Sequence, residues 1–136
     1  MDDAQETTAD EVRIELPATT PFLRLARLNA TAFGTALEFD VDGLEDLRMA
    51  VNEAVTWLLE GVNGGGRSTV QVTLRGTRGH LQISGTLDGS PGTETADGVD
   101  DLISAILGAT VDSFELRTGD GRSFELVKVA ARSRDA

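Results

Sequence analysis

The sequence predicts an α+β fold, a two-layer sandwich in which helices cover one face of a mixed, mostly antiparallel sheet. Short segments that alternate apolar and polar residues predict strands, and segments with apolar residues three or four apart predict helices. These patterns follow the order strand, helix, helix, two strands, helix, two strands, which is typical of helices packed on one side of a sheet. The 136 residues predict a single domain over 11–132, between a disordered acidic tail at 1–10 and a short tail at 133–136.

The first strand is predicted at residues 12–16, where Val, Ile and Leu alternate with Arg and Glu. Thr20 followed by Pro21 predicts the start of the first helix, because threonine favours the N-cap and proline the first helical position. The face of this helix expected to pack inward comprises Phe22, Leu25, Ala26, Ala32 and Phe33. The opposite, polar face carries Arg24, Arg27 and Thr31.

The second helix has the clearest pattern in the chain. Asp42 and Glu45 have the spacing of a capping box, and Gly61 suits the C-terminal cap. The apolar residues that recur with helical period are Leu44, Leu47, Val51, Ala54, Val55 and Leu58. Glu53 and Trp57 lie four residues apart, so they share one face of the helix. They lie on the flank of the apolar stripe, where the floor of a pocket is expected and where Trp57 is expected to be shielded.

The second half of the chain predicts four strands and a helix. Two strands are expected around 70–75 and 81–87, and the residues at 88–98 are turn formers that predict a loop. The last two strands are expected on either side of Gly-Asp-Gly at 119–121, a strong hairpin signal. The third helix lies between these pairs, and its apolar face comprises Val99, Leu102, Ile103, Ile106 and Leu107.

Composition excludes several classes of function. The net charge of −11 makes nucleic acid and anionic membranes poor partners, because phosphate groups are bound by clustered Lys and Arg. A basic protein partner fits this charge. No apolar run approaches the roughly 18 residues of a membrane span, and the acidic, polar N-terminus does not resemble a signal peptide. With no cysteine in the chain, thiolate metal sites and disulfides are excluded, and a cytoplasmic protein is expected.

Two further motifs predict no site. GVNGGGRS at 61–68 nearly spells a phosphate-binding loop, with Arg67 where that motif has lysine. The motif requires a strand before it and a helix after it, whereas here a helix precedes and a strand follows, so a connector is expected. His80 is the only histidine, and without a second histidine or a cysteine it predicts a surface residue rather than a metal ligand. No metal site is expected.

The block LRLARLNATAFGTALEFDVDGLEDLRMAVNEAVTWLLE resembles the bacterial anti-sigma factor family of switch-protein serine kinases. That family shares the ATPase fold of histidine kinases, gyrase and the Hsp90 chaperone. The motif D-L-x-x-A-V-x-E-A-x-T carries the resemblance most specifically. The resemblance implies that Glu53 matches the catalytic glutamate of the family, and that Trp57 takes the place of its magnesium-ligating asparagine.

Three departures from the family predict a degenerate nucleotide site. The indole of Trp57 has only an N–H donor, whereas Mg²⁺ is bound by oxygen ligands. The adenine-binding motif D-x-G-x-G is reduced to Asp88-Gly89, and Asp100-Asp101 replace the glycine-rich start of the third helix. Acids there repel a triphosphate by roughly 4 kcal/mol per close charge pair before screening. Glu53 is therefore expected to be a vestigial base with no cofactor, and ATP with Mg²⁺ is expected only if this interpretation is wrong.

The resemblance implies a homodimer that sequesters an RNA polymerase sigma factor and is displaced by a STAS-domain anti-anti-sigma protein. In the family an arginine on the first helix meets the sigma factor. Arg24 matches this arginine, and Arg27, one turn further, and Thr31 share its polar face. Two alternatives remain open. One is an active serine kinase that uses Glu53 as its base and ATP as phosphate donor. The other is a sandwich domain that binds an unrelated protein.

Overall fold

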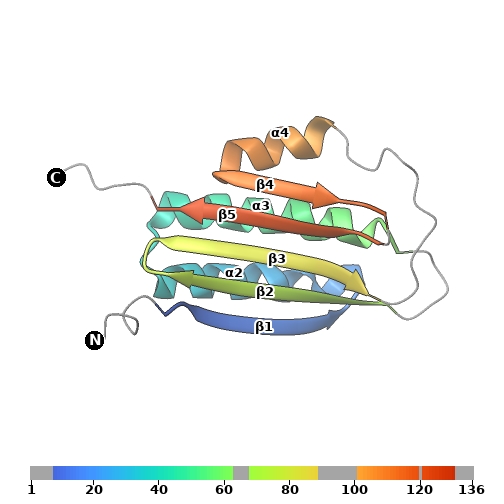
Figure 1. Cartoon of the computed structure of the whole chain (residues 1–136), viewed down its shortest axis with the longest axis horizontal. Coiled ribbons are helices and arrows are strands. Elements are labelled where there is room, and N and C mark those ends of the chain that lie inside the picture. Colours follow the sequence, from blue (N-terminus) through green and yellow to red (C-terminus); the bar gives the residue numbers. More distant parts are fainter. Residues whose placement is uncertain (1–7, 63–67, 89–100, 120, 131–136) are drawn as a thin grey trace.

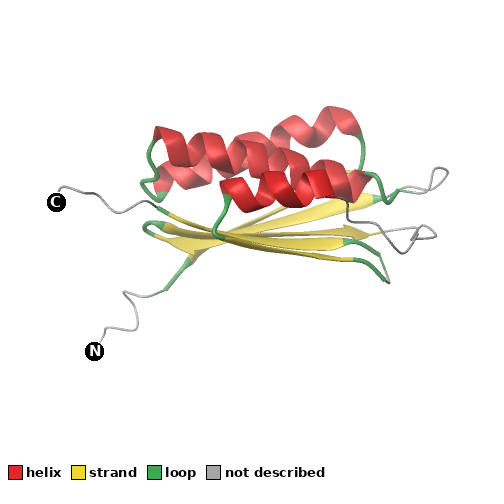
Figure 2. Ribbon diagram, turned by 90° about the horizontal axis from the view of Figure 1, so that it is seen from above, coloured by secondary structure: helices red, strands yellow, loops and turns green. Residues whose placement is uncertain are grey.

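A computed structural model describes residues 8–62, 68–88, 101–119 and 121–130. The chain forms two layers, with a five-stranded sheet on one side and all the described helices on the other (Figures 1 and 2). The strand order is β1-β2-β3-β5-β4. All four neighbouring pairs are antiparallel. The prediction of a mixed sheet allowed for some parallel pairs, and the described strands contain none. The predicted α+β sandwich is confirmed.

The elements follow the predicted order, with one short 3₁₀ helix (η1) added before the first α-helix. Their bounds are β1 Asp10–Pro17, η1 Thr20–Phe22, α2 Leu23–Ala36, α3 Val41–Leu59, β2 Thr69–Thr77, β3 His80–Asp88, α4 Asp101–Thr110, β4 Ser113–Arg117 and β5 Ser123–Val129. Most of the predicted tail at 1–10, most of the glycine-rich motif at 61–68 and nearly all of the predicted loop at 88–98 lie outside the described residues, as does the segment 131–136.

Helix α2 packs on the core through its small residues, which corrects the predicted inward face. The residues it buries are Leu23, Ala26, Ala30 and Gly34, of which only Ala26 belongs to the predicted inward face. Phe22 and Leu25 are 37% and 41% exposed, and Ala32 is also exposed. A Cβ atom on Gly34 would come within 2.9 Å of the side chains of Leu44 and Leu47. The small residues let α2 approach α3 closely, so Leu25 and Leu28 turn outward, while Leu23 is buried and Phe33 packs against the edge of the core as predicted.

Helix α3 begins at Val41, two residues earlier than a cap at Asp42 would place it, and its end differs from the predicted cap. Asp40 is the N-cap, and its carboxylate accepts a hydrogen bond of 2.8 Å from the backbone N–H of Gly43. At the other end Gly61 does not have positive φ, whereas three other described glycines, Gly79, Gly119 and Gly121, do. A Cβ atom at 61 would instead lie 2.9 Å from the side chain of Arg122. Glycine is therefore needed at 61 for close approach rather than for helix termination.

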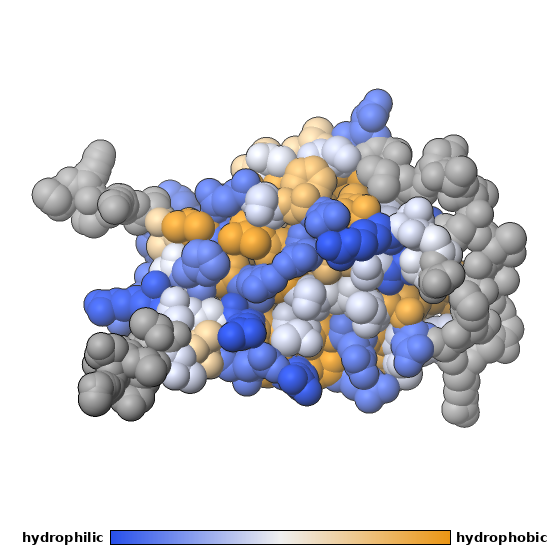
Figure 3. All heavy atoms as spheres, in the orientation of Figure 1, coloured by the Kyte–Doolittle hydropathy of each residue, from blue (hydrophilic) through white to orange (hydrophobic). Residues whose placement is uncertain are grey.

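The core lies between the helices and the inner face of the sheet. Its largest fully buried side chains are Phe124, Leu47, Leu58, Leu74, Leu81, Ile83, Leu107, Leu126, Val51, Val70 and Val72. The other face of the sheet is open, and hydrophilic residues lie across it with hydrophobic atoms visible between them (Figure 3). His80 is exposed at the start of β3, as predicted. No helix of the described segments is long and apolar enough to cross a membrane.

Candidate functional site

A small hollow lies between α3 and α4, at the place where the sequence predicted a pocket floor. Its volume is about 130 Å³, whereas pockets for small-molecule ligands run from about 300 to 1,000 Å³. Glu53 is half-buried in its wall. The residues that line it are Glu53, Thr56, Trp57, Glu60, Leu102 and Ile103. The structure therefore brings Glu53 and Trp57 to one hollow, as their spacing predicted.

Trp57 is 2% exposed and is covered by Arg122. The guanidinium carbon of Arg122 lies 4.8 Å from the centroid of the Trp57 ring, within the range of a cation–π contact. The Nη1 atom of Arg122 also donates a hydrogen bond of 2.6 Å to the backbone carbonyl of Trp57. Arg122 is itself only 8% exposed, and its Nη1 atom lies 3.9 Å from the Glu60 carboxylate. The predicted shielding of Trp57 is confirmed.

Sequence reasoning missed Arg122. It lies directly after the predicted turn at 119–121 and is separated from Trp57 by 65 positions. A single arginine at the start of a strand carries no periodic signal. The one related signal in the sequence is Gly61, next to the end of α3, because the Arg122 side chain lies where a Cβ atom at 61 would be crowded.

The side chains of this hollow are a poor match for a magnesium nucleotide. An indole offers no lone pair for Mg²⁺ at the position where the resemblance implies an asparagine. Two carboxylates, Glu53 and Glu60, line the hollow, and Asp101 lies exposed in the first turn of α4. Gly89 and Asp100, the other residues of the reduced glycine motifs, lie outside the described residues. Across 8–62, 68–88, 101–119 and 121–130, no group of three His, Asp or Glu side chains is placed to hold a metal ion.

The three predicted partner-binding residues on α2 differ in their surroundings. Arg24 is exposed and bonds to no other side chain in the described part of the chain. Arg27 is half-buried, and its Nη1 atom donates a hydrogen bond of 2.7 Å to Oδ1 of Asn52 on α3. The Thr31 hydroxyl donates back to the carbonyls of Arg27 and Leu28 in its own helix. The expectation that Arg24 and Arg27 point outward together is wrong, because Arg27 is drawn against α3.

Apolar side chains accompany Arg24 on the outside of α2. Phe22, Leu25 and Leu28 are spaced three residues apart and are 37%, 41% and 55% exposed. We call these three residues and Arg24 the outer α2 face. The prediction had placed Phe22 and Leu25 in the core and had not used Leu28. Exposed apolar groups around an arginine are typical of protein–protein contact sites.

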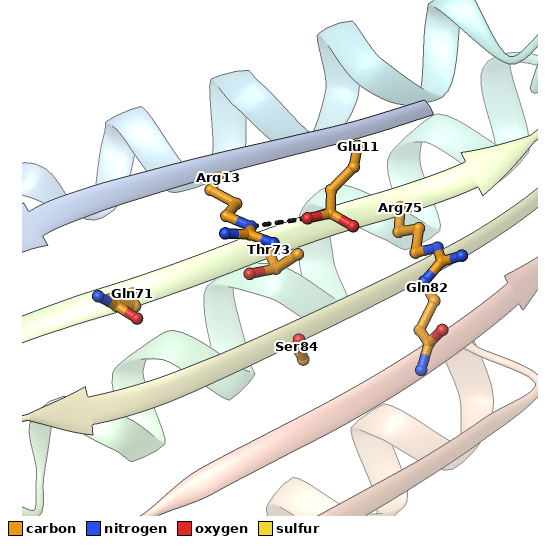
Figure 4. Close-up of a pocket in the computed structure, with 7 residues that line it drawn as sticks. All are labelled: Glu11, Arg13, Gln71, Thr73, Arg75, Gln82 and Ser84. Carbon is orange, nitrogen blue, oxygen red and sulfur yellow. Dashed lines mark hydrogen bonds and ion pairs between the residues drawn. The ribbon is translucent and has the colours of Figure 1, made fainter. Parts of the chain in front are cut away.

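A second hollow, of about 370 Å³, lies on the open face of the sheet (Figure 4). Thr73 on β2 is paired with Ser84 on β3, and these short side chains form its low centre between longer polar ones. In its rim the Nε atom of Arg13 lies 2.6 Å from the Glu11 carboxylate. The residues that line it are Glu11, Arg13, Gln71, Thr73, Arg75, Gln82 and Ser84. They occupy the outward positions of their strands, which accounts for their polarity.

The two-layer architecture defines an α+β sandwich protein in which helix α3 carries Glu53. No protein-family profile matches the chain. The chain is 34% identical over 50 residues to the serine-protein kinase RsbW of Listeria monocytogenes serotype 4a and of Listeria innocua serovar 6a. These matches cover 37% of this chain and 32% of each relative. The chain therefore has weak homology to RsbW over about one third of the length of these relatives, in agreement with the predicted family.

A solved structure has the same fold. The crystal structure of the RsbU and RsbW domains of Rv1364c from Mycobacterium tuberculosis matches 91% of this chain with a TM-score of 0.67. The match covers 33% of that protein's chain, and the sequence identity is 20%. This likeness confirms the ATPase-like sandwich fold over nearly the whole chain.

Proposed function

We propose that this protein is an anti-sigma factor, which binds an RNA polymerase sigma factor and keeps it from the polymerase. The observation that carries the proposal is the outer α2 face, on which Arg24 is exposed among Phe22, Leu25 and Leu28. The resemblance of residues 22–60 to anti-sigma factors and the homology to RsbW support it. The sigma factor is the principal partner, and nucleic acid and membranes are not bound directly.

The outer α2 face has the chemistry of a protein contact site. Full burial of a leucine is worth about 1.5–3 kcal/mol relative to full exposure. Leu25 and Leu28 expose about half of their surface, so each can contribute about 0.7–1.5 kcal/mol to binding. The Arg24 guanidinium can donate two parallel hydrogen bonds to a carboxylate of the partner. The net charge of −11 attracts basic regions of a sigma factor and hastens encounter. Arg27 and Thr31 serve the same face indirectly, since they bond within the helical layer.

The protein acts as a homodimer, and a STAS-domain anti-anti-sigma protein displaces the sigma factor from it. The resemblance supports both parts of this proposal. If antagonist and sigma factor compete for the outer α2 face, then one set of substitutions on that face weakens both complexes. Mutual exclusion is sufficient for switching, because whichever partner is present in excess occupies the face.

ATP binding and kinase activity are lost in this protein, and Glu53 is a vestige of a catalytic base. Trp57 in place of a magnesium ligand and the small volume of the hollow support this statement. The alternative, an active serine kinase that phosphorylates its antagonist, is favoured by the position of Glu53, whose side chain is half-buried in a hollow. A sandwich domain with an unrelated partner is the second alternative.

Surface plasmon resonance against a panel of sigma factors from the source organism tests the proposal. The unmodified protein should bind at least one sigma factor, and Arg24→Ala should bind it more weakly. Arg117→Ala is the matched control, because Arg117 is an exposed arginine of β4 whose pair with Glu115 lies on the open face of the sheet. If the protein binds none of the sigma factors in the panel, the proposal is overturned. Transfer of phosphate from ATP to a STAS-domain protein would establish the kinase alternative.

A further inference from the structure

Trp57 and Arg122 come from opposite halves of the chain and meet at the end of α3. We infer that these two side chains form an internal plug that takes the place of a nucleotide, so that partner binding by this protein does not respond to ATP or ADP. The part of the inference that concerns partner binding rests on the proposed function. The plug itself rests on contacts within the chain.

Trp57 and Arg122 are both buried and contact each other in two ways. The cation of Arg122 lies over the Trp57 ring at 4.8 Å, and its Nη1 atom is bonded to the Trp57 carbonyl at 2.6 Å. Both side chains are more than nine-tenths buried. Gly61 has no side chain, and a Cβ atom there would meet Arg122. The end of α3 is therefore shaped to receive this guanidinium.

The plug also links α3 to the end of β3. Trp57 stands at the position of the magnesium-ligating asparagine. The carbonyl of Arg122 accepts a 3.1 Å hydrogen bond from the N–H of Leu87, the residue next to Asp88, which is what remains of the adenine motif. From that backbone position the Arg122 side chain extends to the α3 carbonyl. Arg122 thus links the end of β3, next to Asp88, to the end of α3 at Trp57.

Displacement is opposed by the charges around the plug. The guanidinium of Arg122 is engaged by a carbonyl and an aromatic ring, and a buried cation that loses such partners is strongly disfavoured. A phosphate group that entered the hollow would meet Glu53 and Glu60 instead of a free cation. The hollow that remains beside the plug, about 130 Å³, is small for any nucleotide.

The consequence is a helix whose position does not depend on a ligand. The plug joins the end of α3 to the start of β5, and Arg27 on α2 is bonded to Asn52 of the same α3. The helix layer that carries the outer α2 face is therefore braced by side chains of the chain itself. A ligand that does not bind cannot shift an equilibrium between two states, so partner exchange is governed by partner concentration alone.

Trp57 is the only tryptophan, so its fluorescence reports on the plug directly. Mg-ATP and Mg-ADP, each added up to 1 mM, should leave the emission, the midpoint of thermal unfolding and the calorimetric baseline of the unmodified protein unchanged. A nucleotide held at 100 times its Kd would stabilise the fold measurably. A saturable change in the micromolar range would overturn the inference.

The pairing is tested by acrylamide quenching of Trp57 in Arg122→Met and in the control Arg117→Met. Loss of the cation that covers the ring should raise the quenching constant by about twofold or more, as expected for an opened cation–π pair. The control should quench like the parent. Arg122→Lys keeps the positive charge in a smaller, unforked head group, so its quenching constant should lie between those of the parent and Arg122→Met. If Arg122→Met fails to fold, the quenching of Arg122→Lys and the nucleotide titration test the plug instead. If the folded Arg122 variant is quenched no more than the parent, the pairing of Arg122 with Trp57 is overturned.

Failures of the two proposals are distinguishable. If the protein binds a sigma factor and Mg-ATP or Mg-ADP changes that affinity more than about twofold, the plug is rejected while the anti-sigma function stands. If no sigma factor binds but nucleotides leave Trp57 unperturbed, the function is rejected while the plug stands.

Discussion

Arg27 on α2 donates a 2.7 Å hydrogen bond from Nη1 to Oδ1 of Asn52 on α3, across 25 positions of sequence. The contact joins the helix that carries the outer α2 face to the helix that carries Glu53 and Trp57. It also holds Arg27 half-buried against α3, whereas its periodicity had predicted that it points outward. The bond makes Arg27 a brace between the two helices and leaves Arg24 as the outward arginine.

Replacing Arg27 should therefore cost stability more than affinity. We expect Arg27→Met to lower the free energy of unfolding by about 1–2 kcal/mol, because it removes a charged hydrogen bond and leaves Asn52 without its donor. Urea denaturation followed by circular dichroism measures this change. Arg48→Met is the control, since the exposed pair of Arg48 with Glu45 should contribute less than about 0.5 kcal/mol. Equal effects of the two substitutions would contradict the brace.

Replacing Arg24 should have the opposite profile. We expect Arg24→Ala to weaken sigma-factor binding by about 2 kcal/mol, mostly through faster dissociation, since arginines at interface centres act as hot spots. The free energy of unfolding should change by less than about 0.5 kcal/mol, as for an exposed side chain. Surface plasmon resonance gives both rate constants. An unchanged dissociation rate with every sigma factor that binds would remove Arg24 from the interface.

The burial of Trp57 predicts a large stability cost on truncation. We expect Trp57→Ala to lower the free energy of unfolding by about 3 kcal/mol or more, as for other large-to-small changes in a core. Guanidinium denaturation followed by circular dichroism at 222 nm is suitable, because the variant has no tryptophan fluorescence. A cost below about 1 kcal/mol, typical of surface positions, is incompatible with a side chain that is 2% exposed.

Two helical glycines provide a matched test of the close approach of α2 to α3. A Cβ atom on Gly34 would lie 2.9 Å from Leu44 and Leu47, whereas one on Gly108 of α4 would meet only Phe114, at 4.0 Å. Gly34→Ala should destabilise the protein by about 1–3 kcal/mol, the range for overpacking. Gly108→Ala should stabilise it by about 0.5–1 kcal/mol through helix propensity. Thermal unfolding of both variants measures the difference, and shifts of the same sign would be evidence against tight α2–α3 packing.

Local patterns in the sequence were sufficient to predict the order of the strands and helices and the type of each. Period-two alternation at residues 12–16 and 70–75 and the long apolar stripe of α3 each reflect burial of one face, which the neighbouring residues already encode. The hairpin at 119–121 was predictable because glycine there adopts positive φ, as Gly119 and Gly121 do. Glu53 and Trp57 reached one hollow because a four-residue spacing fixes their common face.

Contacts between distant segments were decided only in the tertiary structure. The inward face of α2 follows from the small residues that allow close approach to α3, whereas a hydrophobic stripe identifies the largest apolar side chains. Asp40 rather than Asp42 caps α3 because the chain enters the helix two residues earlier. Arg122 covers Trp57 because the antiparallel pairing of β3 with β5 brings the start of β5 beside the end of α3. Periodicity carries no information about such pairings, since they depend on how the elements pack and not on the residues next to them in sequence.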